Sequence, residues 1–383
     1  MIKIKSDKII IGESLFDGTM YVMNGKIVEI SKEDKPAEIA YDFTGKYVSA
    51  GFIDMHTHGA GGHAFMNSEV EDVIAGCNYH FEHGTTTILP TISAGAFPTM
   101  KNAVAHIDEA KKGGKVKPHI LGAHLEGPYL SVNQCGAQCP DFITLPSKED
   151  YQSLVEEYGS AIARWTYAPE KDKDGAFCRY LTEHGILASA GHSDATYADM
   201  QTAIDNGCNL ITHLYSATST VTRNKGFRSL GIIESAYLRD ELNVEIIADG
   251  KHLPPELIQM IIKIKGTDKV ALVTDSLEIA GTEITEGVMS GTEFIVEDGV
   301  CKLKDRTAFA GSVATADSLV KTLVAKCGYS VPTAVKMLTE TPARILKIDN
   351  KKGSLSVGKD ADIIVFDEDI HVLNVFVNGK KEK

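Results

Sequence analysis

Basic residues are scarce in this chain relative to acidic ones: 39 lysines and arginines stand against 52 aspartates and glutamates, a formal net charge of -13. Nucleic acids and anionic membrane surfaces bind basic patches, so we expect neither as a partner. The sequence also lacks an uninterrupted apolar stretch near the ~20 residues that span a bilayer. The segment after Met1 lacks the apolar block of a signal peptide, so we expect a cytoplasmic location.

Cysteine pairs that could build a disulfide framework are missing as well. The seven cysteines are an odd number, are spread along the chain and include no Cys-x-x-Cys pair, so free thiols are expected. Cys135 and Cys139 bracket three residues and could bind metal, but buried or loop thiols are the simpler interpretation. The sequence contains no internal repeat and no low-complexity tract.

What the sequence does contain is a series of eight short apolar, β-branched runs. Each is bounded by Gly, Pro, Asn or Asp, as buried strands are, and they cover residues 47–55, 85–92, 119–125, 163–168, 186–190, 210–214, 244–248 and 270–274. Segments of helical periodicity lie between them, at 68–83, 97–112, 148–158, 197–206 and 254–265. This alternation predicts an α/β fold, a (β/α)8 TIM-like barrel with its active site at the carboxyl ends of the strands.

Both ends of the chain differ from the middle. Residues 1–50 show hairpin-like alternation, with Asp17-Gly18 and Asn24-Gly25 as turn signals, and residues 361–366 and 372–377 are strand-like again. We therefore expect a small β-sandwich domain of residues 1–50 plus 350–383 beside a hydrolase barrel of residues 51–349. Residues 292–296 and 300–303 predict a hairpin inserted after the eighth strand.

Metal-capable side chains end several of the predicted strands. His56 and His58 share a strand face because side chains alternate along a strand; Glu126 ends the third strand, and His192 and His213 follow the fifth and sixth. Taken singly, each has a simpler interpretation, such as a polar strand end, a loop-capping carboxylate or a core histidine. Their shared position favours one metal site, and neutral imidazoles beside a carboxylate suit zinc or ferrous iron better than magnesium or calcium.

Asp275 follows the eighth strand. Metal-assisted hydrolysis needs a base that takes a proton from water and an acid that returns it to the leaving group, and one carboxylate can serve for both. An isolated Thr-Asp-Ser would indicate a helix N-cap instead. Its position at a strand end makes Asp275 the candidate general base.

Eight motifs together give the sequence a family resemblance. They are GFIDMHTHG at 51–59, HLEGP at 124–128, GHS at 191–193, THL at 212–214, ADGKH at 248–252, VTD at 273–275, AGS at 310–312 and GSLSVGKDAD at 353–362. The ordered set resembles the amidohydrolase superfamily and, within it, the N-acetylglucosamine-6-phosphate deacetylases. A His-x-His pair alone would be weak support, whereas HLEGP combined with ADGKH is highly specific.

The resemblance implies a metal-dependent deacetylase that converts N-acetylglucosamine 6-phosphate into glucosamine 6-phosphate and acetate in amino-sugar catabolism. It implies one or two divalent ions, most simply Zn²⁺ with Fe²⁺ as the alternative: Glu126, His192 and His213 hold the principal ion, and His56 and His58 hold a second one with Glu126 and Asp275. It also implies a homodimer and Asp275 as general base and then general acid. The implied substrate contacts are Ala137, Gln138, Ser216, Ala217, His252, Phe309, Ala310 and Gly311, with Arg223 or Arg228 on the phosphate.

Two departures from the family pattern affect substrate groups. The family usually reads GAHNP where this chain has GAQCP at 136–140, so the neutral amide of Gln138 replaces an imidazole expected near the scissile carbonyl. The family often reads HL, Phe or Tyr, NAM and then REPG, where this chain has HLYSAT at 213–218 and RNKGFR at 223–228. The metal ligands are unaffected, so another amidohydrolase acting on a different N-acylated sugar or cyclic amide is the main alternative. A non-catalytic sugar-phosphate sensor and a purely structural barrel are weaker alternatives.

Overall fold

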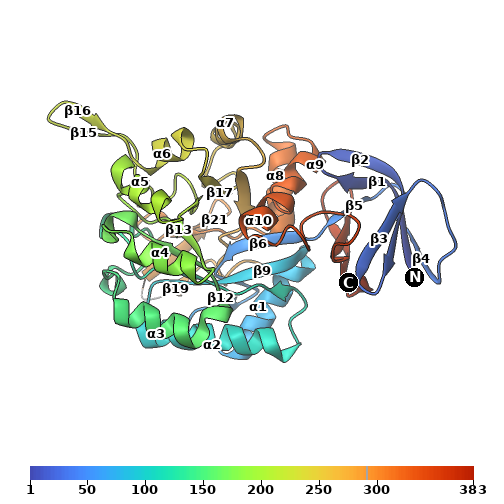
Figure 1. Cartoon of the computed structure of the whole chain (residues 1–383), viewed down its shortest axis with the longest axis horizontal. Helices are drawn as coiled ribbons and strands as arrows, with labels where there is room; N and C mark the ends of the chain where they lie inside the picture. Colours follow the sequence, from blue (N-terminus) through green and yellow to red (C-terminus); the bar gives the residue numbers. More distant parts are fainter. Residues whose placement is uncertain (290–291) are drawn as a thin grey trace.

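A nearly closed barrel of parallel strands makes up most of the computed structural model, which describes residues 1–289 and 292–383 (Figure 1). The strands around the barrel are β6 (Phe52–Thr57), β9 (Thr85–Ile92), β11 (Ala123–Glu126), β12 (Ile162–Tyr167), β13 (Leu187–Ala190), β14 (Leu210–Ile211), β17 (Asn243–Ile247) and β18 (Val270–Val273). The main-chain N–H of Asp275, just after β18, donates to the carbonyl of His56 in β6 at 2.9 Å. This contact joins the first and last strands, and the expected (β/α)8 fold is confirmed.

The barrel strands are apolar runs because the barrel buries both of their faces. Every residue of β6, β9, β11 and β17 is buried, as expected for parallel strands covered by helices. The helices on the outside are α1 (Val70–Glu82), α2 (Phe97–Gly113), α3 (Lys148–Tyr158), α4 (Ala176–Glu183), α5 (Tyr197–Asp205), α6 (Ile232–Leu238), α7 (Pro255–Lys265), α8 (Ala316–Ala325), α9 (Val331–Lys336) and α10 (Glu340–Ile345).

Hydroxyl side chains fix where some of these helices begin. The side chain of Ser147 accepts a hydrogen bond from the N–H of Asp150 at the start of α3, and Thr196 accepts one from Asp199 at the start of α5. Each bond satisfies a main-chain donor that the helix itself leaves free. The N-cap residues Ser147 and Thr196 thus determine where these two helices begin.

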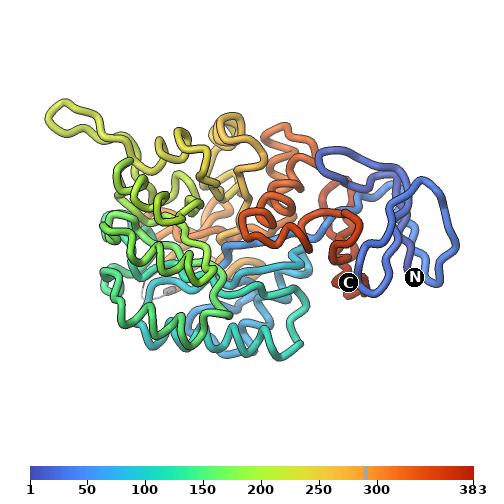
Figure 2. The backbone as a smooth tube through the Cα atoms, viewed as in Figure 1, coloured from blue at the N-terminus to red at the C-terminus, as the bar shows by residue number. Residues whose placement is uncertain are grey.

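A second sheet combines the two ends of the chain (Figure 2). Its strands run in the order β25 (Lys380–Lys381), β24 (Val372–Val377), β23 (Ile363–Phe366), β5 (Tyr47–Ala50), β1 (Ile2–Ile11), β2 (Ser14–Met23) and β3 (Lys26–Ser31), and β4 (Ile39–Asp42) pairs with β1. It encloses its own apolar core, which includes Ile4, Val48 and Phe376. The expected small β-domain of terminal segments is present beside the barrel.

Three local expectations need correction. The predicted strand 47–55 is two strands, because the chain passes from the terminal sheet to the barrel at Gly51, where a Cβ would lie 2.1 Å from Thr86. The predicted strand 119–125 is likewise divided, into β10 (His119–Ile120) and β11, around Gly122. Asp17-Gly18 is not a turn but lies inside β2, and the chain reverses before Ser14 instead.

Short hairpins lie in the connections between the barrel elements. The expected hairpin after the eighth strand is present as β20 (Thr292–Glu297) and β21 (Val300–Leu303), in a sheet completed by β19 (Glu286–Met289) and β22 (Phe309–Gly311). A two-stranded hairpin of β15 (Thr222–Asn224) and β16 (Phe227–Ser229) projects away from the barrel (Figure 1). β7 (Gly59–Ala60) pairs with β8 (His63–Ala64). Across the described residues, no helix combines the length and the apolar character needed to cross a membrane.

Candidate active site

The ends of the barrel strands open into a cavity of about 660 Å³. His58, Glu126, His192, His213 and Asp275 line it, so five of the six residues expected in the metal centre reach one space. His56, the sixth, lies directly behind this wall and is fully buried. Side chains from β6, β11 and the loops after β13, β14 and β18 meet here because parallel strands end on one face of a barrel.

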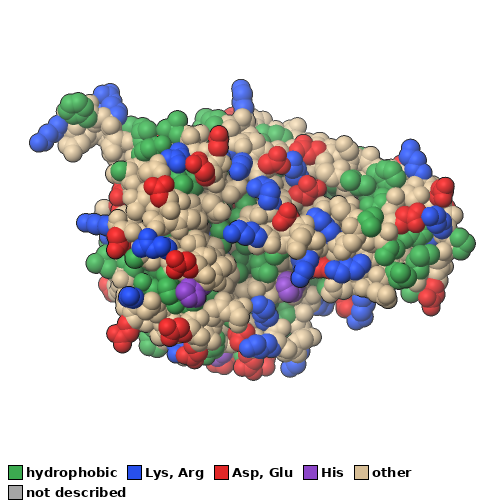
Figure 3. Space-filling view, in the orientation of Figure 1, with side chains coloured by type: hydrophobic (Ala, Val, Ile, Leu, Met, Phe, Trp, Pro, Cys, Tyr) green, Lys and Arg blue, Asp and Glu red, His purple; other side chains and the backbone are tan. Residues whose placement is uncertain are grey.

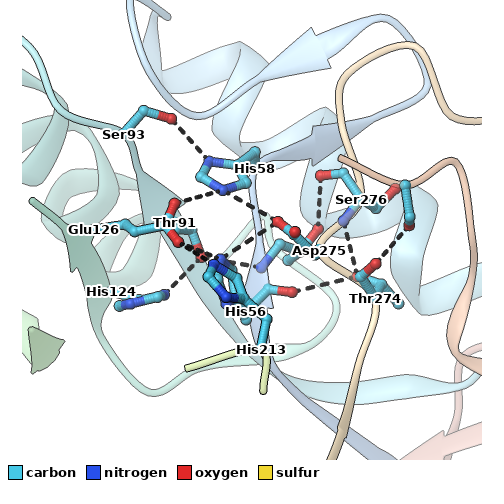
Figure 4. Close-up of polar contacts among 12 residues, drawn as sticks. His56, His58, Thr91, Ser93, His124, Glu126, His213, Thr274, Asp275 and Ser276 are labelled. Carbon is cyan, nitrogen blue, oxygen red and sulfur yellow. Dashed lines mark hydrogen bonds and ion pairs between the residues drawn. The ribbon is translucent and has the colours of Figure 1, made fainter. Parts of the chain in front are cut away.

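Glu126 lies at the centre of the cluster (Figure 4). Its Oε1 is 3.2 Å from Nε2 of His192 and 3.1 Å from Nε2 of His213, and its Oε2 is 3.1 Å from Nε2 of His58. Nε2 of His56 lies 3.4 Å from Oε1. One carboxylate therefore faces four imidazoles, so Glu126 belongs to both groups of three residues that could hold a metal ion.

Asp275 faces the same point from the other side of the His-x-His pair. Its Oδ1 lies 3.4 Å from Nε2 of His56 and 3.3 Å from Nε2 of His58. His192, His213 and Asp275 all have left-handed main-chain conformations, with φ of 48°, 27° and 47°. Such conformations are unfavourable for residues other than glycine and concentrate at functional sites, where the surrounding fold holds them.

The residues present fit a divalent metal. Nδ1 of His192 donates to the carbonyl of Gln134 at 2.8 Å, and Nδ1 of His213 donates to the carbonyl of Ser216 at 3.0 Å. A carbonyl only accepts, so the proton sits on Nδ1 and each Nε2 turns a lone pair toward the cavity, as metal-bound histidines do. Two sets of three ligand atoms lie within 4.8 Å of one another: His56, His58 and Glu126, and Glu126, His192 and His213.

The charges in the cluster favour a cation. Burial opposes the ionisation of Glu126, but the imidazoles of His56 and His192 hold its pKa well below its usual range. Burial also disfavours a charged His56, yet the carboxylates of Glu126, Asp275 and Glu245 raise its pKa well above 6.5. The pKa of Asp275 is lowered despite burial, chiefly by His56 and His58. The carboxylates thus stay ionised and attract positive charge, whether a proton or a metal ion carries it.

The expected substrate contacts other than the two arginines lie around the same cavity. They are Ala137, Gln138, Ser216, Ala217, His252, Phe309, Ala310 and Gly311. His252 is oriented by Asp249, whose carboxylate lies 2.8 Å from Nδ1, and its ring packs edge-on against Phe309 at 4.9 Å between centroids. His252 is thus held against the cavity wall on which the resemblance places the phosphate.

Gln138 has a role that its sequence position did not indicate. Its Nε2 donates to Oε2 of Glu126 at 2.7 Å, and its Oε1 accepts the main-chain N–H of Ala94 at 2.8 Å. Both halves of the amide are therefore engaged, and the bond from Ala94 fixes which end faces Glu126. The amide steadies Glu126 instead of pointing freely into the cavity.

Arg223 and Arg228 are not brought to the cavity by this chain. They lie opposite each other on β15 and β16, in a hairpin whose residues 221–228 are all exposed. The short turn at 225–226 folds the two strands back on each other, and the hairpin they form projects away from the barrel, so neither guanidinium lines the cavity. Within residues 1–289 and 292–383, the cavity wall contains no lysine or arginine.

Two charged residues beneath the site were not expected as site residues. Arg164 in β12 and Glu245 in β17 are fully buried, and Glu245 contacts Nδ1 of His56 at 2.7 Å. Their signal in the sequence was a pair of opposite charges inside apolar strand runs. Asp54, which shares the face of the His-x-His pair, accepts the hydroxyl of Thr274 at 2.6 Å instead of joining the cluster. Cys135 and Cys139 are free thiols, as expected.

Comparison with known proteins assigns the family. The model of the Amidohydrolase family matches residues 47–381. The chain belongs to the amidohydrolase family. Among curated amidohydrolase relatives, N-acetylglucosamine-6-phosphate deacetylase of Haemophilus influenzae is 31% identical over 94% of this chain and 93% of its own length. The deacetylase of Lysinibacillus sphaericus is 30% identical over 91% and 89%.

Solved structures agree over the whole chain. The N-acetylglucosamine-6-phosphate deacetylase of Pasteurella multocida superimposes with a TM-score of 0.92 at 31% identity, covering 100% of this chain and 99% of that one. A mutant of the Mycobacterium smegmatis deacetylase in complex with N-acetyl-D-glucosamine-6-phosphate gives a TM-score of 0.91 at 26% identity, covering 99% and 98%. The likeness therefore includes both the amidohydrolase barrel and the terminal sheet.

Proposed function

We propose that this chain hydrolyses the acetamide of N-acetylglucosamine 6-phosphate to glucosamine 6-phosphate and acetate. The observation that carries the proposal is the contact of Asp275 with His56 and His58 at the wall of a cavity that Glu126, His192 and His213 also line. A sugar-phosphate sensor has no need of an ionised acid–base carboxylate beside a ligand cluster. Similarity along the full length of deacetylase relatives adds the substrate class.

The principal ion would be held by Glu126, His192 and His213, and a second by His56 and His58 with Glu126 and Asp275. The nitrogen and carboxylate donors suit Zn²⁺, with Fe²⁺ as the alternative. A divalent ion in this place supplies Lewis-acid chemistry, which polarises a carbonyl oxygen and makes water a stronger acid.

Asp275 carries the proton in both halves of the reaction. Its Oδ1 takes a proton from the attacking water, whose oxygen bonds to the acetamide carbon. The same oxygen then gives this proton to the sugar nitrogen as the C–N bond breaks, so acetate and a free amine leave. The pKa of Asp275 is lowered, chiefly by His56 and His58, so the carboxylate enters the reaction ionised, as a proton acceptor must.

We propose a homodimer in which the β15–β16 hairpin of one protomer brings Arg223 or Arg228 to the phosphate in its partner's cavity. Phe227 between them is 80% exposed, and the hairpin carries basic and hydrophobic side chains at its tip (Figure 3). His252 would meet the same phosphate from within the chain. The guanidinium would add the charge-assisted bonds that phosphate binding needs.

The seven free cysteines support a cytoplasmic location.

The test is acetate release from purified, metal-loaded protein. N-acetylglucosamine 6-phosphate should be a far better substrate than unphosphorylated N-acetylglucosamine, because the phosphate contributes binding. Turnover of a cyclic amide without turnover of the sugar phosphate would overturn the proposal. Gln138 in place of the family's usual histidine favours a different N-acetylated hexosamine phosphate as the second candidate, which the galactosamine and mannosamine isomers would reveal.

A further inference from the structure

A buried ion pair lies directly beneath the His-x-His half of the site. Nη1 of Arg164 is 2.5 Å from Oε2 of Glu245, and its Nη2 is 2.9 Å from Oε1. Neither side chain is exposed to solvent. The pair is bidentate, so both the separation and the plane of the carboxylate are fixed.

The remaining donors of Arg164 tie the pair to neighbouring barrel strands. Its Nε donates to the hydroxyl of Ser189 at 3.0 Å, its Nη2 to the hydroxyl of Thr212 at 2.8 Å, and its Nη1 to the carbonyl of Met55 at 3.2 Å. Burying two charges costs desolvation free energy that an apolar pair of similar size would not incur. A role beyond stability is therefore expected for the pair.

Glu245 in turn fixes the orientation of the His56 imidazole. Its Oε1 is 2.7 Å from Nδ1 of His56 and also accepts the main-chain N–H of His213 at 3.2 Å. A carboxylate engaged by a guanidinium can only accept, so Nδ1 of His56 must donate. Nε2 of His56 then turns toward Glu126 and Asp275, where it is buried and has no hydrogen-bond partner within the described part of the chain.

His56 differs from the other histidines of the cluster in this support. Nδ1 of His192 and of His213 each donate to a main-chain carbonyl, and Nδ1 of His58 lies 3.0 Å from the hydroxyl of Ser93. Of these four histidines, only His56 has an Nδ1 that contacts a member of a buried ion pair. The orientation of His56 as a ligand therefore depends on two residues that do not face the cavity.

We propose that Arg164 and Glu245 are positioning residues that fix His56 as a metal ligand and so create the second ion site, formed with His58. The inference rests on the proposed function in that the chain binds divalent ions. It goes further by assigning to the second ion a support that holds the imidazole of its ligand His56, whereas on the side of the principal ion Glu245 contacts only the main-chain N–H of His213. Partners of this kind, hydrogen-bonded to the far nitrogen of a ligand histidine, change metal affinity by about 10- to 100-fold.

Two double variants test the acceptor at position 245, which takes hydrogen bonds from Nδ1 of His56 and from the main-chain N–H of His213. Arg164→Met with Glu245→Gln removes both charges but keeps an oxygen that can accept from His56 Nδ1 and from the N–H of His213. Arg164→Met with Glu245→Leu removes the same charges and leaves no acceptor. The two variants lose the same contacts of Arg164, so they differ only at position 245.

The measurement is metal stoichiometry and affinity, by calorimetric titration of Zn²⁺ into the metal-free full chain and by elemental analysis after dialysis. The native chain should bind two ions. The Gln variant should keep the second ion, and the Leu variant should bind it at least about 10-fold more weakly while the first ion changes less. Equal second-ion affinity in the two variants would overturn the positioning role.

A third variant covers the case in which the double variants do not fold, which circular dichroism would reveal. Glu245→Asp keeps the charge beside Arg164 but withdraws the carboxylate from His56 by one methylene, so the second ion should again weaken selectively. An unchanged second ion would count against the proposal. A chain that binds no divalent ion in any form would instead overturn the proposed metal-dependent function, so the two failures are distinguishable.

Discussion

Asp275→Asn removes the proton carrier and leaves the shape of the site almost unchanged. Oδ1 of Asp275 lies 3.4 and 3.3 Å from the imidazoles of His56 and His58, and the isosteric amide keeps this position but accepts no proton. General acid–base catalysis contributes about 10²- to 10⁴-fold. We therefore expect kcat to fall by this factor, or about 2.7 to 5.4 kcal/mol of activation free energy at 1.36 kcal/mol per decade.

Metal content separates this effect from loss of the site. The proposed ligands of the principal ion are Glu126, His192 and His213. Asp275 is not among them, so elemental analysis should find this ion in the variant while acetate release becomes slow. Glu278→Gln is a matched control, because it removes a carboxylate on the cavity wall that has no contact with the histidine cluster. An Asp275→Asn variant with near-normal turnover and intact metal would refute the acid–base role.

Four further outcomes follow from the geometry. Removal of metal by a chelator should abolish acetate release and lower the melting temperature, and Zn²⁺ or Fe²⁺ should restore both. Gln138→Ala should weaken metal binding by about 10- to 100-fold, because it removes the amide donor to Glu126. Arg223→Ala or Arg228→Ala should raise KM for the phosphorylated substrate about 10- to 100-fold, the value of a lost charge-assisted bond. Leu125→Ala should lower the free energy of unfolding by about 2–5 kcal/mol in urea titrations, because Leu125 is fully buried.

Each of these outcomes has a control. Slower turnover of Gln138→Ala with unchanged metal affinity would return Gln138 to polarising the scissile carbonyl. The two arginine variants should leave turnover of unphosphorylated N-acetylglucosamine unchanged, and an equal loss on both substrates would contradict a phosphate contact. Leu145→Ala, at a position 66% exposed, should change stability by no more than about 0.5 kcal/mol. Activity that survives complete metal removal would contradict metal dependence.

The barrel and the ligand cluster could be predicted because parallel strands end on one face. Once the apolar runs are assigned to strands, His56, Glu126, His192, His213 and Asp275 each fall at a strand end, and closure of the barrel brings them within contact of one another. The division of residues 47–55 between two sheets could not be predicted, because both halves are apolar and only the close approach at residue 51 separates them.

The Arg164–Glu245 pair shows what a single sequence conceals. The two residues are 81 positions apart, and each alone is an unexplained charge in an apolar strand; only the order of strands around the barrel reveals that they meet below His56. Gln138 is similar, because its bond to Glu126 depends on how the loop between β11 and α3 folds back. The tight turn of the β15–β16 hairpin fixes how its two strands pair. It does not fix the direction in which the hairpin leaves the barrel.

The most direct measurement is an anomalous difference map from crystals of the metal-loaded chain, recorded across the zinc absorption edge. We predict one peak among Glu126, His192 and His213 and a second between His56 and His58, sharing the carboxylate of Glu126. Absence of any peak in contact with Glu126, or an ion bound elsewhere in the chain, would contradict the account.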